Sequence, residues 1–269
     1  MAMIHPVTGE HITSYCKLMQ DPATAEVWMT AFRKDFGGMC QGDDKTNTIG
    51  TNAIFVMEPK DVPNIPKDQP PTYAKVVAAY RPQKDDPYQI RITAGSNLIN
   101  YPGKLTTRTA NMTTAKLHWN SVLSTPNARY MFLDIGNFYL SATLDRYEYM
   151  KMPIGLFLPW TIKQYDLLNK VVRGFVYLQM RKAVWGLPQA GILANKLLRK
   201  RLAPHGYFEC SHTPGLWKHS TRPISFTLVV DDFGIKYKRQ EDIDHLIAAL
   251  KPSIISPKIG QAISTATSN

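Results

Sequence analysis

The sequence predicts an α+β protein. Segments such as "YAKVVAAYRPQKDDPYQIRITAG" read as two apolar-rich strands around a polar turn, which is typical of a hairpin. Other segments, such as "QAGILANKLLRKRLAPHG", place leucines near one face at helical spacing. Hydrophobic residues make up 44% of the 269 residues, which is enough apolar material to bury a core.

The first part of the chain predicts one helix, one short strand and one hairpin. Asp21 can cap a helix over "DPATAEVWMTAFRKDFGG", with Pro22 in its first turn and Gly37-Gly38 as its end. The apolar run "AIFVM" predicts a strand within the loop-rich residues 39–72. The hairpin follows, and its turn is expected at Lys84–Pro87.

The remainder of the chain mixes predicted strands and helices. Strands are expected at "RYMFLD", "YEYMKMPIG" and "FVYLQMRKAVWG", and on both sides of Asp231-Asp232 in "FTLVVDDFGIKY". Helices are expected at "TTAKLHWNSVLS", "QAGILANKLLRKRLAPHG" and "EDIDHLIAALKP". The Ser- and Thr-rich residues 252–269 predict a disordered tail.

The charge of the chain indicates an anionic partner. Lys and Arg number 32 against 21 Asp and Glu, a net charge of +11. Nine Lys or Arg residues lie between Lys163 and Arg201, where Asp166 is the one acid. Such a basic segment favours nucleic acid as the partner, and a merely solvated basic surface is the alternative.

The cysteines and the hydropathy pattern predict an intracellular protein. Cys16, Cys40 and Cys210 are too few and too widely spaced for a disulfide framework or a zinc site. A reducing compartment, in the cytoplasm, a virus-like particle or the nucleus, is the simplest inference. The N-terminus has no apolar signal core, and no window reaches the length of a membrane span, so no membrane partner is expected.

Three aspartates are the candidate catalytic residues. Asp231 and Asp232 stand side by side at the tip of an apolar hairpin, and Asp134 closes the strand "YMFLD". Adjacent carboxylates repel each other, so a hard cation such as Mg²⁺ (or Mn²⁺) would make the cluster favourable. Together they could hold two ions, as polymerases do for in-line displacement at phosphorus. An ordinary surface turn is the alternative for the Asp-Asp pair.

At this point the sequence resembles a known family. The ordered segments "FLDIGNFY", "AVWGLPQAG" and "LVVDDFGIKY" are similar to motifs A, B and C of retrotransposon reverse transcriptases, most closely of the copia type. The segment "RPQKDDPYQIRITAGSNLIN" resembles the fingers hairpin of that family. The resemblance covers about residues 73–250, and Asp231 follows Asp134 by 97 residues, a suitable spacing.

The resemblance implies a right-hand polymerase architecture with fingers and palm, whose small antiparallel palm sheet is backed by helices. It divides the chain into four regions. These are a lead-in at residues 1–72, a fingers-like region at 73–130, a palm with motifs A, B and C at 131–251, and the tail at 252–269.

The resemblance also assigns roles to individual residues. Asp134, Asp231 and Asp232 would be the catalytic metal ligands. Tyr139 matches the aromatic residue that excludes the 2′-hydroxyl of the incoming nucleotide, although a core tyrosine beside Phe138 is equally compatible with the local pattern.

Further residues would contact the substrates. Gln189 matches the motif B glutamine at the nucleotide, and Arg91 matches an arginine that clamps the triphosphate. Arg81 is a weaker candidate for the same nucleotide site, as is Lys84. The residues expected along the template or duplex are Lys182, Lys196, Arg199 and Lys200.

The sequence departs from the family at two places. Val229 stands where motif C usually has an aromatic residue, and the resemblance stops after Lys251. A thumb and an RNase H domain are not recognisable, so a partner chain or polyprotein segment would supply them. Lys251 or Lys258 could replace the lysine of motif D, but neither is assigned that role.

The expected function is RNA-directed DNA polymerisation on a template-primer, with dNTP as substrate. The first alternative is a truncated, inactive retroelement fragment that only binds nucleic acid. The second is an unrelated metal-dependent phosphotransferase, which the long basic segment disfavours because small substrates need no such length.

Overall fold

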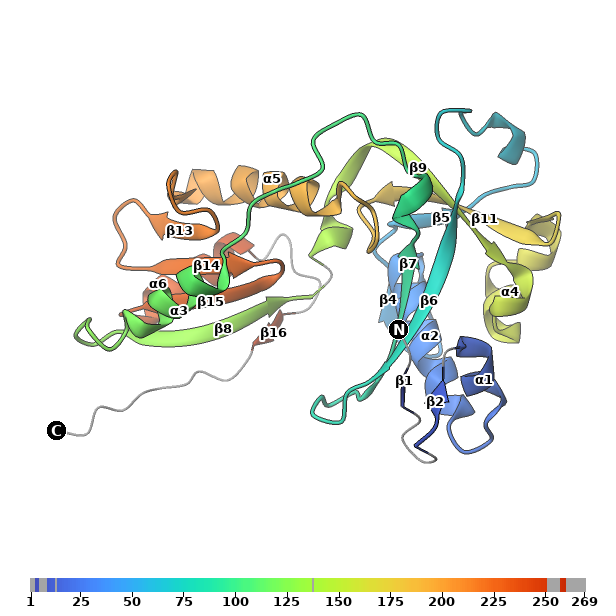
Figure 1. Ribbon diagram of the computed structural model, residues 1–269, viewed down its shortest axis with the longest axis horizontal. Helices are drawn as coiled ribbons and strands as arrows, with labels where there is room; N and C mark the ends of the chain where they lie inside the picture. Colours follow the sequence, from blue (N-terminus) through green and yellow to red (C-terminus); the bar gives the residue numbers. More distant parts are fainter. Residues whose placement is uncertain (1–2, 5–8, 13, 137, 251–256, 260–269) are drawn as a thin grey trace. The chain divides into compact units, whose positions relative to one another are not determined.

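The computed structural model describes residues 1–269 apart from 1–2, 5–8, 13, 137, 251–256 and 260–269. The chain forms two compact units (Figure 1). Unit 1 consists of Met1–Gly103 and Tyr139–Ala190, and unit 2 consists of Lys104–Phe138 and Gly191–Asn269. Both units combine helices with sheets, which confirms the α+β prediction.

Unit 1 is built on a six-stranded sheet with the order β10-β11-β9-β6-β7, to which β5 adds by pairing with β11. The predicted hairpin is confirmed, because β6 pairs with β7 in antiparallel register. β6 and β9 run parallel, and the other neighbours run antiparallel. The strands are β5 (Ile54–Val56), β6 (Thr72–Tyr80), β7 (Tyr88–Ala94), β9 (Thr143–Pro153), β10 (Val171–Val172) and β11 (Phe175–Lys182).

Helix α2 (Ala25–Met39) supplies much of the apolar core of unit 1. Trp28, Phe32 and Phe36 are fully buried, and the Phe36 ring meets Phe157 edge to face at 5.3 Å between centroids. Burial of these large rings is the main source of stability in such a layer.

The predicted bounds of this helix were wrong at both ends. It begins at Ala25, because the Asp21 carboxylate accepts hydrogen bonds from Ala23 N and the Thr24 hydroxyl and holds a separate turn. Gly37 lies inside its last turn, where a Cβ would come within 2.8 Å of the Asp43 Cβ. The glycine is therefore a point of close approach rather than a stop signal.

The other elements of unit 1 are short. Two-stranded sheets pair β1 with β2 and β3 with β4. Their bounds, with those of the short helices, are β1 (Met3–Ile4), β2 (His11–Ile12), α1 (Tyr15–Gln20), β3 (Gly42–Asp43), β4 (Thr48–Ile49) and α4 (Pro159–Gln164).

Unit 2 is built on an antiparallel sheet with the order β12-β13-β14-β15-β8-β16. The predicted strands on both sides of Asp231 and before Asp134 are confirmed. The strands are β8 (Arg129–Ile135), β12 (Tyr207–Glu209), β13 (Leu216–His219), β14 (Ser225–Val229), β15 (Asp232–Tyr237) and β16 (Pro257–Ile259).

Helices lie on both faces of this sheet (Figure 1). α5 (Ala190–Leu202) and α6 (Gln240–Leu250) lie on the apolar face, since Arg199 covers the Trp217 ring and Tyr207 bonds His245. α3 (Met112–Asn120) lies on the opposite face, where His118 Nε2 is 2.9 Å from Ser225 Oγ. All three helices were predicted from the sequence, and the Asn111 side chain caps α3.

The two units do not follow the predicted regional boundaries. Residues 139–190, expected in one region with Asp134, belong to unit 1, because β9 and β11 pair with β6 and β5. Residues 104–130, expected with the hairpin, belong to unit 2, because α3 packs on β14. Residues 257–259 of the expected disordered tail form β16, and 252–256 and 260–269 lie outside the described residues.

Candidate active site

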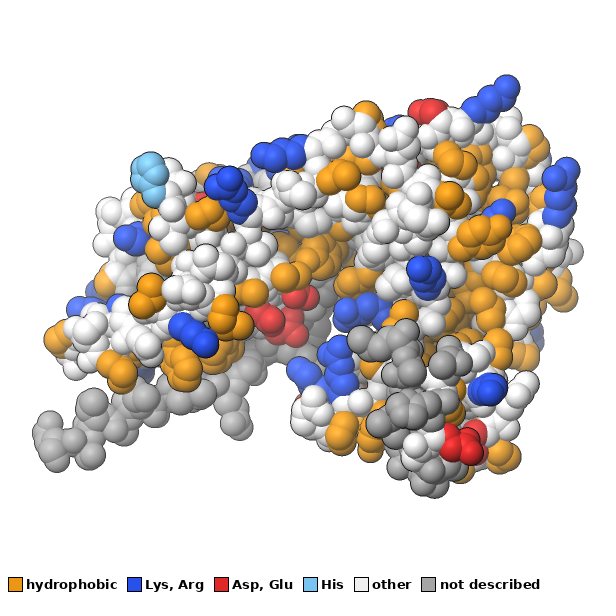
Figure 2. Space-filling view, viewed as in Figure 1, with side chains coloured by type: hydrophobic (Ala, Val, Ile, Leu, Met, Phe, Trp, Pro, Cys, Tyr) orange, Lys and Arg blue, Asp and Glu red, His pale blue; other side chains and the backbone are white. Residues whose placement is uncertain are grey.

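The strand register of unit 2 brings the three predicted aspartates to one end of the sheet. Asp134 on β8 is the direct partner of Asp232 on β15. Val229 on β14 also pairs with Asp232, so Val230 and Asp231 form the two-residue turn between these strands. Figure 2 shows acidic side chains gathered at the end of this sheet.

The sheet turns these carboxylates toward solvent. Side chains of directly opposed residues in an antiparallel pair point to the same face, so Asp134 and Asp232 share a face. Their neighbours Leu133 and Phe233 point to the other face and are buried. The alternation of buried and exposed residues in β8 therefore fixes which face carries the aspartates.

The turn itself holds an unusual backbone conformation. Val230 has φ of 61°, in the left-handed region that β-branched residues avoid, and its side chain is 49% exposed. Such a conformation costs about 1–3 kcal/mol and persists where the surrounding structure imposes it. Here the pairing of Val229 with Asp232 leaves only two residues to reverse the chain, and this places Asp231 next to the facing pair.

Two facing carboxylates repel each other, and a bound cation would relieve that repulsion. Like charges directly opposite each other destabilise a sheet. No three His, Cys, Asp or Glu side chains among the described residues are already drawn together into a metal-binding group. Opposed positions have Cβ atoms about 4.5–5.5 Å apart. Rotation about their side-chain bonds can therefore bring the carboxylates of Asp134 and Asp232 to the same hard cation, which prefers oxygen ligands. The backbone need not move.

A polar network stabilises the same face farther along the strands. The Tyr130 hydroxyl packs against Gly234 so closely that a Cβ on Gly234 would clash with it. His118 bonds Ser225, and Lys236 Nζ donates to Ser121 Oγ at 2.8 Å and to Thr125. Sequence reasoning missed this network, because its members are far apart in the chain.

The network contains a histidine with a displaced pKa. Burial, followed by the nearby charge of Lys236, lowers the pKa of His118 to about 4. The ring is therefore neutral near pH 7, so one of its nitrogens can accept a hydrogen bond while the other donates one. This neutral state suits its two contacts, Ser225 Oγ at 2.9 Å and the Tyr130 hydroxyl at 3.4 Å.

The far side of β8 carries the short strand β16. Lys258 occupies the register position opposite Asp134, and Ile259 the position opposite Leu133. Asp134 thus has a pairing residue on each neighbouring strand. Lys251, the other lysine considered for motif D, lies outside the described residues.

The predicted nucleotide-site residues belong to unit 1. Arg91 is exposed on β7, with its guanidinium 4.8 Å from the centre of the Trp185 ring. Arg81 is exposed at the start of the hairpin turn, where its N–H donates to Pro87 O. Tyr139 is half-buried and begins a short 3-10 helix, Tyr139–Ser141, next to the buried Phe138.

Gln189 lies in a buried polar cluster that the sequence did not predict. Its side chain is fully buried, and its Nε2 donates to Glu148 Oε1 at 3.3 Å. Arg146 donates to the same Glu148 oxygen and to Asn100 O. Burial raises the pKa of Glu148, and the bonds from Arg146 oppose that shift. The side-chain carbonyl oxygen of Gln189 is buried without a hydrogen-bond partner, so it can still accept a hydrogen bond.

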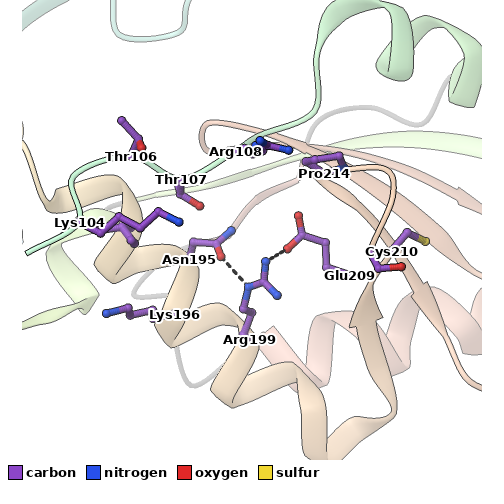
Figure 3. Close-up of a pocket in the computed structure, with 12 residues that line it drawn as sticks. Lys104, Thr106, Thr107, Arg108, Asn195, Lys196, Arg199, Glu209, Cys210 and Pro214 are labelled. Carbon is purple, nitrogen blue, oxygen red and sulfur yellow. Dashed lines mark hydrogen bonds and ion pairs between the residues drawn. The ribbon is translucent and has the colours of Figure 1, made fainter.

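The four predicted nucleic-acid contacts fall in different settings. Lys182 is half-buried in unit 1, and its Nζ donates to Thr51 O at 2.6 Å, so this ammonium already has a protein partner. Lys196 and Arg199 line a pocket of about 680 Å³ in unit 2 (Figure 3). Lys200 is exposed on the same helix but is not part of the lining.

The pocket is basic. Lys104 and Arg108, which the sequence analysis did not single out, line it together with Lys196 and Arg199 (Figure 3). The acidic residue of the lining, Glu209, forms an ion pair with Arg199. The Glu209 carboxylate also accepts a hydrogen bond from the backbone N–H of Gly215 at 2.6 Å. Lys104, Arg108 and Lys196 therefore have no acidic partner among the described residues, and Thr107 and Asn195 add polar groups. Such a lining suits phosphate groups.

Comparisons with known proteins do not extend these observations. No protein-family model matches the chain, and a search of curated proteins finds no significant match. In the described part of the chain, no helix combines the length and the apolar character that crossing a membrane requires. The likeness to reverse transcriptases therefore rests on the motifs themselves.

Proposed function

We propose that this chain is an RNA-directed DNA polymerase of the copia-type retrotransposon family, with the catalytic aspartates in unit 2. One observation carries the proposal: Asp134 directly opposes Asp232, and Asp231 occupies the intervening turn. Three carboxylates from segments 97 residues apart share one end of a sheet, in the order in which the motifs occur.

Asp134, Asp231 and Asp232 would hold divalent cations, Mg²⁺ or Mn²⁺. Oxygen ligands and an exposed position suit such ions, which keep coordination sites for phosphate. When bound, the cations supply charge neutralisation for nucleotidyl transfer. The contribution of the chain is positional: β8 and β15 hold the carboxylates at fixed register, and the Val230 turn holds Asp231 beside them.

The substrates would be dNTP and an RNA template with its primer. Arg91 presents an exposed guanidinium suited to a triphosphate, and Arg81 is a second cation on the same hairpin. Gln189 is the proposed motif B glutamine, although its side chain is buried here with an unfilled carbonyl acceptor. Tyr139 is the proposed sugar-selecting ring. The basic pocket adds Lys104 and Arg108 to Lys196 and Arg199 as phosphate contacts, and Lys200 is exposed on the same helix outside the lining.

Primer extension tests the proposal directly. The chain is given a primed RNA template, dNTP and Mg²⁺, beside an Asp231→Asn/Asp232→Asn variant. A matched control, Glu241→Gln/Asp244→Asn, removes two exposed charges from α6 of the same unit. Incorporation by the chain and the control, but not by the Asp231/Asp232 variant, is the expected result.

The alternatives predict other outcomes. Salt-dependent binding of the template without incorporation by any protein would assign the chain as a nucleic-acid-binding fragment and reject the polymerase. Phosphate release from nucleotides that is independent of template would instead indicate a phosphotransferase. Omission of Mg²⁺ should abolish incorporation while leaving most of the template binding intact.

A further inference from the structure

One face of the unit 1 sheet carries several aromatic side chains. The register places them on one face, which we call the aromatic face, while the alternate residues Met150, Val176 and Leu178 are buried on the other. The aromatic face consists of Phe55, Tyr73, Tyr147, Phe175 and Tyr177, with Lys151, Gln179 and Arg181 among them. Tyr149 lies on the same side of the sheet but is buried. Tyr73 and Tyr147 are the most open of these rings, at 49% and 44% exposed.

Two cations are held against these rings. Lys151 Nζ lies 4.6 Å from the centre of the Tyr73 ring and 5.1 Å from that of Phe175. The Arg181 guanidinium carbon lies 4.0 Å above Phe55 and 5.5 Å from the Tyr147 ring. In the part of the chain that the structure describes, neither cation forms an ion pair with an acidic side chain. Their charge therefore remains available to an anion from solution.

The aromatic face continues into a pocket. The proline-rich residues 62–71 form a pocket of about 340 Å³ against Tyr177. Its lining is mostly apolar, with Lys67 as its cation. Tyr177 is the direct strand partner of Lys151, so the pocket lies beside the cation-bearing centre of the face.

We propose that the aromatic face binds single-stranded nucleic acid, with bases stacked on its rings and phosphates at Lys151 and Arg181. Exposed rings on a sheet beside cations are the arrangement on which unpaired bases stack. The site is separate from the aspartates of unit 2 and does not depend on the polymerase proposal.

Charge and geometry favour this occupant over duplex or protein. The chain carries a net charge of +11, and Lys151 and Arg181 have no acidic partner to displace. Bases in a duplex are already stacked on each other, so a ring platform gains little from them. A protein partner would have to take both cations out of water, which requires matching acids on the partner.

Fluorescence anisotropy tests the stacking contribution. The probe is a labelled oligouridylate of about 12 nucleotides, within the usual size of such sites. All proteins carry Asp231→Asn/Asp232→Asn and are measured in EDTA, so the polymerase site is disabled. Tyr73→Ala and Tyr147→Ala should each weaken binding about tenfold. Trp119→Ala, which removes a ring 50% exposed on α3, is the control and should leave binding unchanged.

An abasic oligomer of equal length separates stacking from charge. The tyrosine variants should bind it as tightly as the parent, because it offers no base to stack. Arg181→Ala should weaken binding of both oligomers and reduce the slope of log K against log salt by about 0.7. Lys238→Ala, which removes one exposed charge in unit 2, should give a smaller change.

Photocrosslinking of the parent protein needs no substitution. A 4-thiouridine oligomer should link to peptides that contain β6, β9 or β11. The proposal fails if links are confined to unit 2 or if the tyrosine variants bind like the parent. In those cases the rings serve only the packing of the sheet, and primer extension still decides the polymerase proposal separately.

Discussion

Asp134 and Asp232 face each other across the β8–β15 pair, on the side of the sheet opposite the apolar core. The two residues are neighbours only because the strands are in this register. A shift of one residue would turn one of the carboxylates to the buried face. The packing of Leu133 and Phe233 therefore maintains the facing pair.

Removal of one of these charges should stabilise the protein in the absence of divalent ions. Asp134→Asn keeps the shape of the side chain and relieves the repulsion, for a gain of about 0.5 kcal/mol in the free energy of unfolding. Urea unfolding in EDTA measures this gain. A loss of stability in EDTA would contradict the view that the two carboxylates repel each other.

The same variant should lose stabilisation by Mg²⁺. A ligand that binds only the folded state adds about 1.4 kcal/mol when its concentration is about ten times its Kd. We expect the melting temperature of the parent to rise with MgCl₂ and that of Asp134→Asn to rise much less. Glu241→Gln is the control for a general salt effect. Equal responses of all three proteins would reject cation binding at this site.

Gly234 should not tolerate a side chain. A Cβ at this position would overlap the Tyr130 hydroxyl, so Gly234→Ala should cost about 1–3 kcal/mol of folding stability. Tyr130→Phe removes the obstructing oxygen. In a double-mutant cycle measured by urea unfolding, Gly234→Ala should therefore cost less in the Tyr130→Phe background. Additive effects would show that the contact with Tyr130 is not the cause.

His118 should make the stability depend on pH. Its pKa is lowered from an ordinary value near 6.5 to about 4, so the unfolded chain binds a proton that the folded protein does not. Stability is then complete above about pH 6.5 and falls as the pH drops toward 4, by on the order of 3 kcal/mol.

Unfolding in urea at several pH values between 4 and 7 checks this sign. His118→Gln retains a group that can bond Ser225 but cannot titrate, so its stability should vary less with pH in this window. His212→Gln changes an exposed histidine and should keep the pH dependence of the parent. A dependence that survives His118→Gln would assign the effect to another group.

The basic pocket should contribute phosphate contacts. Lys104→Ala/Lys196→Ala removes two lining ammonium groups and should weaken duplex binding. If each contacts one phosphate, the slope of log K against log salt should fall by about 1.8. Lys218→Ala/Lys238→Ala removes two exposed charges of the same unit outside the lining. An equal slope change in that control would show only a general charge effect.

The sequence by itself determined the local elements and the identity of the three aspartates. The strands at Thr72–Tyr80, Arg129–Ile135 and Ser225–Val229, and the helix at Ala190–Leu202, follow from apolar periodicity and turn residues. These patterns act over a few residues, so one sequence is enough to read them. The start of α2 was misread because Asp21 satisfies a local turn instead of the helix.

Only the tertiary structure decided how these elements combine. In the folded protein, residues 139–190 belong to unit 1, and Asp134 pairs with Asp232. Tyr130 contacts both His118 and Gly234. The tertiary structure also placed Lys182 on a backbone carbonyl and Gln189 in a buried cluster. Strand pairing and burial depend on contacts between distant segments, whose free energy no local pattern encodes.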